Sequence, residues 1–272
     1  MRACVVLTSA ESKRLIAKAV AQMDEVKYAL RNGLIVITRG TTSAFVAEEI
    51  LGKELDKAAF AGGLVIPMGL CINKTLLREI VIERGKVRED LSYADAVDKL
   101  GAGDVYIKSA NALDPYGNVG ILLAGRDGGT IGRAIGTIVA RGVSLIIPVG
   151  LEKSIPARVF EVSREMGQER LDYSMGLPVG YMPLRGKVVS EVEAIKILSG
   201  AEALPVASGG VCGAEGAVTL LILGGEDNVN EAIKIVESVK GEPQVKAYPA
   251  DCEVCDWKNC HMQARRLAGK SV

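Results

Sequence analysis

Leu34-Ile-Val-Ile-Thr38-Arg39-Gly-Thr-Thr-Ser43 is an apolar run that passes directly into a loop of small and hydroxyl-bearing residues. The run Leu34–Thr38 has the length and the β-branched side chains of a buried strand. Helix-forming residues follow at once over Ala44–Leu51, and Gly52 marks the end of that helix. A strand that turns straight into a helix leaves several backbone N–H groups facing one point, where an anion can bind. The stretch therefore predicts an α/β fold with an anion-binding loop.

The alternation of strand and helix continues on both sides of this stretch. Apolar runs of strand length are separated by segments with helical periodicity. The predicted strands lie at 3–8, 34–38, 104–108, 119–124 and 143–149, and the predicted helices at 10–23, 24–31, 44–51, 92–100 and 131–141. Such alternation is typical of α/β proteins. Residues 1–185 are therefore predicted to form an α/β ligand-binding domain around an open, mostly parallel, three-layer sheet, whose first helix is capped by Ser9.

The pattern changes after about Gly186. Strand, helix, two strands joined by a glycine-rich loop, helix and strand follow one another at 187–190, 191–198, 202–207, 217–223, 228–240 and 244–248. This order, βαββαβ, matches a ferredoxin-like split unit. Residues 186–250 are therefore predicted to form a ferredoxin-like α+β domain, and residues 251–272 a cysteine-rich C-terminal tail.

The composition indicates a large aliphatic core. Hydrophobic residues make up 49% of the 272 residues, yet only three are Phe and one is Trp. A core of Val, Ile, Leu and Ala is typical of buried parallel strands covered by helices. Lys+Arg and Asp+Glu balance at 33 each, so no net field favours nucleic acid or an acidic membrane surface as a partner. Because neither a signal peptide nor an apolar run of membrane-spanning length is visible, we expect a cytoplasmic protein with no membrane partner; a homo-oligomer stays open.

The chain has a single histidine, His261. A serine–histidine triad and a metal centre with several histidines are therefore excluded by count. Acid–base catalysis elsewhere in the chain must use carboxylates, lysine, tyrosine or thiols.

Three of the six cysteines gather near the C-terminal end, in Cys252-Glu-Val-Cys255-Asp-Trp-Lys-Asn-Cys260, directly before His261. Cys-x2-Cys is the usual chelating pair of a zinc site, and three cysteines also suit an iron–sulfur cluster. Cys252, Cys255, Cys260 and His261 are therefore the predicted ligands of zinc or of an iron–sulfur cluster. Three reduced surface cysteines without an ion are the alternative. Adjacent Cys260 and His261 are poorly placed to bind one ion together, and Cys212 would lie at the opposite end of a βαββαβ sheet, so the fourth donor stays open.

Four segments of the first domain share a further pattern. They are the strand and Ser/Thr loop Ile37–Ser43, the strand and turn Asp104–Ala112 with Asp114 and Gly117, the glycine pair and threonine Gly128–Thr130, and the strand and lysine Pro148–Lys153. Together they resemble the superfamily that includes ribose-5-phosphate isomerase, glucosamine-6-phosphate deaminase and the coenzyme A transferases. The resemblance covers about residues 34–153. It implies an open α/β fold and a small anionic ligand, either a sugar phosphate or an acyl-thioester.

The sequence departs from this pattern where the family keeps its carboxylates. Asn111-Ala112 stands where the isomerases carry an acidic pair, and Arg133-Ala134 stands where they carry a carboxylate after the glycine pair. An amide cannot take a proton from a sugar carbon. No glutamate has the sequence context of a nucleophile for coenzyme A transfer. The resemblance therefore predicts a fold and an anionic ligand, and leaves the reaction open.

Two loops and their neighbours supply the candidate site. Glycine pairs before a helix start, flanked by arginine, suit anion recognition. The alternatives are an ordinary strand-to-helix turn capped by Ser43 and a surface loop with an Arg126–Asp127 pair. The predicted ligand-binding residues are Arg39, Gly40, Thr41, Thr42, Ser43, Ser109, Asn111, Arg126, Gly128, Gly129 and Thr130, and the predicted acid–base groups are Lys108, Asp114, Asp127 and Lys153.

The sequence thus predicts a protein that binds a small anionic metabolite in a pocket of glycine-rich loops. An isomerase- or transferase-like activity stays open because the family's carboxylates are missing. The alternatives are a non-catalytic ligand sensor, and an iron–sulfur or metal-binding redox or assembly protein that acts through its C-terminal cysteines.

Overall fold

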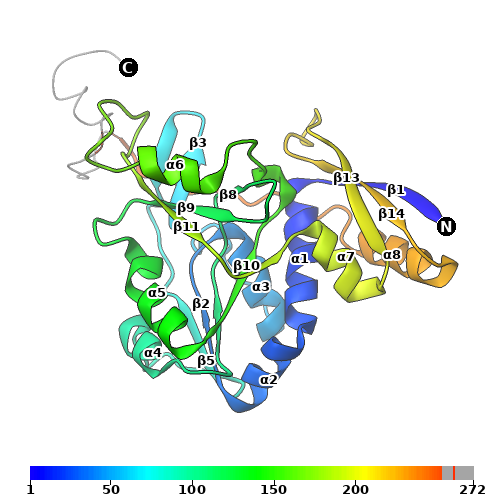
Figure 1. The fold of residues 1–272 in the computed structure, drawn as a ribbon, viewed down its shortest axis with the longest axis horizontal. Coiled ribbons are helices and arrows are strands. Elements are labelled where there is room, and N and C mark those ends of the chain that lie inside the picture. Colours follow the sequence, from blue (N-terminus) through cyan, green and yellow to red (C-terminus); the bar gives the residue numbers. More distant parts are fainter. Residues whose placement is uncertain (253–259, 261–272) are drawn as a thin grey trace.

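A six-stranded mixed sheet forms the centre of the computed structural model, which describes residues 1–252 and Cys260 (Figure 1). Across the sheet the order is β12 (Lys187–Val189), β10 (Ser144–Pro148), β7 (Val105–Ile107), β2 (Leu34–Ile37), β5 (Ile80–Glu83) and β6 (Lys86–Val87). The first four strands run parallel to one another. β5 is antiparallel to β2, and β6 is antiparallel to β5. The predicted α/β class is confirmed, with a sheet that mixes parallel and antiparallel pairs.

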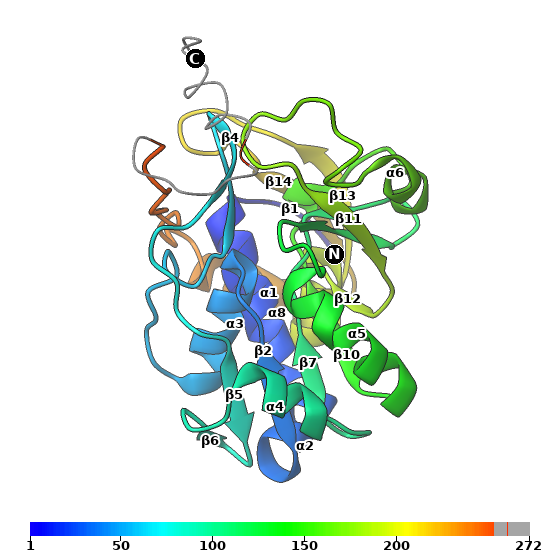
Figure 2. The same cartoon turned by 90° about the vertical axis from the view of Figure 1, so that its left-hand side faces the viewer.

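Helices pack against both faces of this sheet because alternate strand residues point to opposite sides. They are α1 (Ser9–Gln22), α2 (Asp24–Asn32), α3 (Thr41–Leu51), α4 (Tyr93–Lys99) and α5 (Gly129–Arg141). Ile35 and Ile37 belong to the buried cluster that includes α1 and α3, whereas Leu34 and Val36 belong to the one that includes α4 and α5. Figure 2 shows α1 and α3 close together and α5 on the other side of β2 and β7. All four β2 side chains are buried, as the apolar run predicts.

The helix ends follow local sequence signals, with small differences from the prediction. Thr8, one residue before the predicted Ser9, caps α1 in a capping box with Glu11. Gly40 occupies the cap position of α3, so Ser43 lies inside that helix and caps nothing. Gly52 ends α3 in the left-handed conformation, with φ 62°, which glycine adopts without steric cost.

A smaller antiparallel sheet lies beside the main one. It consists of β8 (Ala112–Leu113), β9 (Val119–Leu123) and β11 (Gly180–Leu184), while β3 (Gly63–Ile66) and β4 (Gly69–Ile72) form a hairpin. The prediction that 119–124 adds to the main sheet is therefore wrong. β9 finds its partners in β8, across a tight turn, and in β11, far along the chain. The remaining short helices are η1 (Leu151–Lys153) and α6 (Val159–Glu165), and no helix within residues 1–252 is long and apolar enough to cross a bilayer.

The third sheet joins the N-terminal strand to two strands from the last third of the chain. Its order is β1 (Arg2–Leu7), β14 (Val218–Leu223) and β13 (Glu202–Ser208), packed with α7 (Glu191–Ser199) and α8 (Glu226–Ser238). The predicted ferredoxin-like unit is not formed by 186–250 alone. Its first predicted strand, β12, pairs with β10 in the main sheet, and residues 244–248 form no strand. The apolar N-terminal strand β1 occupies the edge beside β14 instead, through six paired residues.

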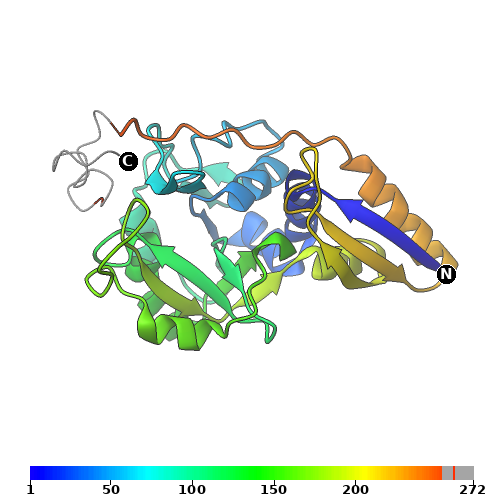
Figure 3. The same cartoon turned by 90° about the horizontal axis from the view of Figure 1, so that it is seen from above.

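Residues 240–252, which we call the C-terminal strap, run from the third sheet to the β3–β4 hairpin (Figure 3). The strap reaches the open edge of β4 through backbone bonds. Lys74 N donates to Tyr248 O at 2.7 Å, and Ala250 N donates to Ile72 O at 3.1 Å. Tertiary contact with a strand edge therefore replaces the strand predicted at 244–248.

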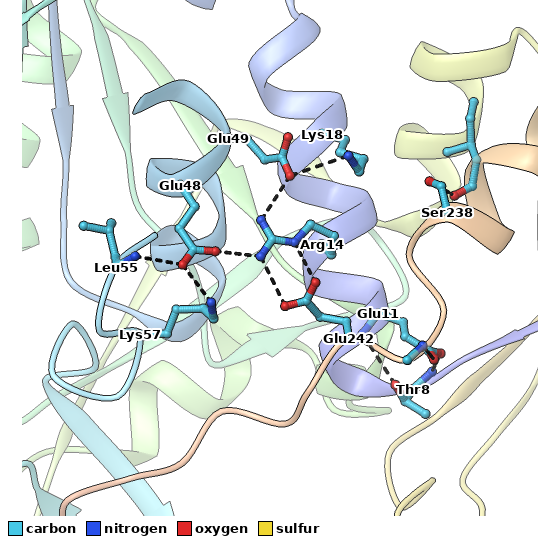
Figure 4. Close-up of polar contacts among 12 residues, drawn as sticks. Thr8, Glu11, Arg14, Lys18, Glu48, Glu49, Leu55, Lys57, Ser238 and Glu242 are labelled. Atoms are coloured by element: carbon cyan, nitrogen blue, oxygen red, sulfur yellow. Dashed lines mark hydrogen bonds and ion pairs between the residues drawn. The ribbon is translucent and has the colours of Figure 1, made fainter. Parts of the chain in front are cut away.

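Arg14 of α1 holds the start of the strap against α3 (Figure 4). Its guanidinium donates to Glu48 Oε2 at 2.6 Å, to Glu49 Oε1 at 3.0 Å and to Glu242 Oε2 at 2.9 Å. The cation also lies 4.7 Å from the centre of the Phe45 ring. Three carboxylates and one aromatic ring thus converge on a single arginine, which is 15% exposed.

Candidate functional site

The carboxyl ends of the four parallel strands meet at one edge of the main sheet. In open α/β sheets this edge is where ligands bind. The chain leaves it through the segments Thr38–Ser43 after β2, Lys108–Asn111 after β7, Val149–Lys153 after β10 and Ser190–Glu191 after β12. Lys13 of α1 also reaches it. Most of the charged side chains at this edge belong to segments that follow different strands, so they meet only in the folded chain.

The segments after β2 and β7 are in direct contact. Ser43 Oγ lies 3.2 Å from Ser109 Oγ and accepts a hydrogen bond from Ser109 N at 3.3 Å. A Cβ atom added to Gly40 would lie 2.1 Å from Ser109 Oγ, so any larger residue there would displace the Ser109 hydroxyl. The structure thus brings together the predicted residues Gly40, Ser43 and Ser109. Thr42 is fully buried at the same helix start, and its Oγ1 has no hydrogen-bond partner.

Lys108 and Lys153 place two amines in the same region. Lys153 Nζ donates to Ala110 O at 2.7 Å. Within the described chain, the Lys108 ammonium has no hydrogen-bond acceptor and no ion-pair partner. Burial, and then the positive charges of Lys153 and Arg39, lower the pKa of Lys108 to about 8. Burial, followed by the charge of Lys13, likewise lowers the pKa of Lys153 to about 8, against the opposing pull of Glu152.

The positive charge of Arg39, predicted to attract the ligand, is already paired with a carboxylate. Its Nε donates to Glu79 Oε1 at 2.7 Å, and both side chains are largely shielded from solvent. Glu79 is also the acidic group whose charge acts on Lys108. Among the described residues at this edge, Lys108 and Lys153 form no ion pair, although the charge of Glu79 acts on Lys108 and that of Glu152 acts on Lys153.

A buried acidic pair, Glu152 and Glu191, lies beside Lys153 and was missed by the sequence analysis. Glu152 Oε1 accepts from Lys13 Nζ at 2.8 Å, and Glu191 Oε2 accepts from Leu151 N at 2.9 Å. The other oxygen of each carboxylate, Glu152 Oε2 and Glu191 Oε1, is buried without a hydrogen-bond partner. Such a pair can hold a proton between two groups of different acidity.

The two carboxylates differ in acidity because their surroundings differ. Burial, and then the negative charge of Glu152, raise the pKa of Glu191 to about 7. The pKa of Glu152 is lowered: burial opposes ionisation there, but the charges of Lys13 and Lys153 outweigh it. At neutral pH, Glu152 is therefore the base of the pair and Glu191 retains a proton in part of the molecules.

A local signal for these residues existed. Glu152 follows the apolar strand β10 closely, and Glu191 is the first helical residue after β12. Charged residues directly after buried parallel strands point to the ligand-binding edge. The missing information was that α1 brings Lys13 to Glu152 across 139 positions of sequence.

Replacing Glu191 with glutamine is expected to change how stability depends on pH. Since the folded pKa of Glu191, about 7, exceeds the unfolded value of 4.5, ionising this group opposes folding increasingly as pH rises from about 4.5 to 7. Glutamine cannot ionise, so Glu191→Gln should gain about 2–3 kcal/mol over the wild type between pH 5 and pH 8. Urea unfolding at both pH values measures this, with exposed Glu202→Gln as the control. Equal pH dependence of wild type and Glu191→Gln would contradict the buried, raised-pKa assignment.

Asp114 and Asn111 serve the β8–β9 hairpin. The Asp114 carboxylate accepts from Tyr116 N and Asn118 N, both at 2.9 Å, and from Val159 N at 3.2 Å. Burial would raise the pKa of Asp114, but these bonds, with the Asn118 side chain foremost, lower it. Asn111 Oδ1 accepts from Leu122 N at 3.1 Å. The geometry gives Asp114 the role of organising a turn, and both side chains already have backbone partners.

The loop at 125–130 lies apart from the lysine pair. Gly128 and Gly129 have φ of 78° and 59°, so the glycine pair is explained by left-handed backbone at the start of α5. Arg126 pairs with Glu169 at 2.8 Å on the surface, and Asp127 is exposed. The carbonyl oxygen of Thr130 accepts from the buried Tyr106 and the partly buried Tyr93. Within residues 1–252, no hydrogen bond or ion pair joins this loop to Lys108 or Lys153.

The predicted metal ligands fall mainly outside the described residues. Cys255 and His261 lie outside them, whereas Cys252 and Cys260 are described and partly buried. Among the described side chains, no three His, Cys, Asp or Glu residues gather closely enough to hold a metal ion. Zinc and iron–sulfur binding therefore stay predictions from the sequence.

A hollow of about 340 Å³ lies at the other end of the main sheet. It is lined by Ser144, Arg185 and Lys187, at the amino ends of β10 and β12, and by Glu25 and Val139 from α2 and α5. The predicted site residues do not line it.

Comparison with known proteins adds no assignment to this geometry. No family model, no curated protein and no solved structure matches the chain.

Proposed function

We propose that the protein binds a small anionic metabolite at the carboxyl edge of the main sheet. The observation that carries this proposal is the pair Lys108 and Lys153, two partly buried lysines that form no ion pair among the described residues. Burial of a cation that forms no ion pair is unfavourable, so an anion that binds beside these lysines gains weakly screened attraction. A phosphate or carboxylate group supplies that charge.

The start of α3 strengthens the attraction. Its first N–H groups have no partner within the helix, and the helix dipole places partial positive charge there. Gly40 lets the chain approach Ser109 closely, and Thr42 adds a buried hydroxyl without a partner. Helix start and lysines attract the same kind of group.

The acidic pair favours an enzyme over a passive sensor. A ligand held at Lys153 lies near Glu152 and Glu191, of which one is ionised and the other partly protonated at neutral pH. Such a pair can take a proton from one atom of a ligand and give one to another. Sugar phosphates and acyl-thioesters remain the ligand classes of this proposal, which keeps the resemblance to the isomerase, deaminase and coenzyme A transferase superfamily.

Calorimetric titration with inorganic phosphate tests the binding proposal. We expect the wild type to bind phosphate and Lys108→Ala to bind it at least tenfold more weakly, since a charge-assisted hydrogen bond contributes about 1.5–3 kcal/mol. Lys99→Ala, which removes an exposed lysine of α4, is the matched control and should bind like the wild type. Equal affinities for the wild type and Lys108→Ala, or no binding by either, would refute the site.

Enzyme and sensor differ in what happens after binding. Proton NMR of the protein with a panel of sugar phosphates and acyl-coenzyme A thioesters reports turnover directly. For an enzyme, Glu191→Gln should abolish turnover and keep phosphate affinity within about twofold. Thermal stabilisation by a panel member that is never converted would favour the sensor.

A further inference from the structure

We propose that Lys108 is a nucleophilic amine that forms an imine with the carbonyl group of an anionic aldehyde or ketone. The inference rests on the proposed function, because the anion site would hold the acidic group of that substrate. It goes beyond binding by naming a covalent step, its nucleophile and a substrate class.

The backbone at Lys108 is held in place while its amine is left without a partner. Lys108 N donates a hydrogen bond to Ile146 O of the neighbouring strand at 3.1 Å. The next residue also has a fixed backbone, because Ser109 N donates to Ser43 Oγ. Lys153 differs, because its Nζ is committed to Ala110 O. Of the two lysines, Lys108 therefore has the amine that can attack a bound molecule, and Lys153 is the neighbouring cation.

The charges that face Lys108 come from three segments. Lys153 of η1 and Arg39 after β2 are cations, and Glu79 before β5 is the opposing acid, itself paired with Arg39. Desolvation and a neighbouring cation both lower the pKa of a lysine, so that part of its amine is neutral near neutral pH. With its pKa lowered to about 8, about half of Lys108 is neutral at pH 8, against about 0.3% of an ordinary lysine.

The step balances without an oxidant, a reductant or a further reactant. The amine nitrogen of Lys108 attacks the carbonyl carbon, a C–N bond forms, and the carbon–oxygen bond breaks. The carbonyl oxygen leaves as water together with the two hydrogens of the amine. Protonation of the resulting imine turns it into an electron acceptor for cleavage of an adjacent C–H or C–C bond, and water reverses the reaction.

Reductive trapping tests this step on the wild-type protein. The probe is pyridoxal 5′-phosphate, an anionic aldehyde, followed by sodium borohydride, which reduces an imine to a stable secondary amine, and by peptide mass mapping. At pH 8 we expect Lys108 to be labelled at least tenfold faster than exposed Lys99. Lys153→Met should slow labelling of Lys108, since loss of the neighbouring cation raises the pKa of Lys108 and weakens the anion site. Labelling of Lys108 no faster than Lys99 would overturn the proposal.

A neutral aldehyde separates the two proposals. Propionaldehyde reacts with an activated amine but gains nothing from an anion site. If phosphate binds in the calorimeter while neither aldehyde labels Lys108 preferentially, the imine step fails and the binding function stands. If propionaldehyde labels Lys108 rapidly while phosphate does not bind, the nucleophile is supported and the anion site is refuted.

Discussion

Replacing Arg14 with alanine is expected to lower the free energy of unfolding by about 3–5 kcal/mol. The substitution removes one cation and leaves the carboxylates of Glu48, Glu49 and Glu242 close together, with Glu48 only 5% exposed. Breaking a buried ion pair by deleting one partner costs more than the pair contributes, because the remaining charges stay desolvated. The cation above the Phe45 ring is lost as well.

Urea unfolding at pH 7 measures this effect, and Lys18→Ala is the matched control. Lys18 lies on the same helix, is 36% exposed and, among the described residues, pairs only with Glu49 at 3.7 Å, so its loss should cost less than about 1 kcal/mol. A similarly small loss for Arg14→Ala would show that the carboxylates find other partners.

Lowering the pH should reduce the difference in the free energy of unfolding between the wild type and Arg14→Ala. Burial disfavours ionised Glu48, but bonds from Lys57, Leu55 and Arg14 lower its pKa below the unfolded value of 4.5. A lowered folded pKa means that this group stabilises the fold above pH 4.5 and loses its contribution as pH falls through the folded pKa. In Arg14→Ala the bond from Arg14 to Glu48 is already absent, so acid removes less stability from this variant than from the wild type.

Replacing Tyr106 with alanine is expected to destabilise the protein by about 3–5 kcal/mol. Tyr106 lies in the middle of β7, is fully buried, and belongs to the cluster between the sheet and α4 and α5. Its hydroxyl lies 2.8 Å from the Tyr93 hydroxyl and 3.3 Å from Thr130 O. Burial raises the pKa of Tyr93 to about 12, so the hydroxyl pair stays neutral and hydrogen-bonded at physiological pH.

Tyr106→Phe separates packing from hydrogen bonding. Phenylalanine keeps the ring and removes only the hydroxyl, and Tyr93 still donates to Thr130 O, so the loss should be about 1 kcal/mol. Thermal and urea unfolding of both variants provide the comparison. Equal losses for the two variants would mean that the hydroxyl network, rather than the buried ring, supports this face of the sheet.

Sequence reasoning succeeded where the signal is local. The apolar runs at 34–38, 104–108 and 143–149 form β2, β7 and β10, because a buried strand needs only a short stretch of β-branched and aliphatic residues. Lys108 and Lys153, both predicted as acid–base groups, stand just after two of these strands. Strand direction alone places them at the same edge of a parallel sheet.

The tertiary structure decided what depends on partners far apart in sequence. β1 pairs with β14 and β9 with β11, and neither pairing has a local signal, because any apolar strand can fill an open sheet edge. For this reason residues 186–250 do not form a ferredoxin-like unit by themselves: β12 joins the main sheet, and β1 takes the edge beside β14.

The sequence by itself determined the α/β class, the aliphatic strands and the lysines at their ends, since propensity and periodicity act over a few residues. Only the tertiary structure revealed the pair Glu152 and Glu191, the ion pair with Lys13 and the turn role of Asp114. The acidity of a carboxyl group depends on its burial and on nearby charges, and both are set by segments that meet only when the chain folds.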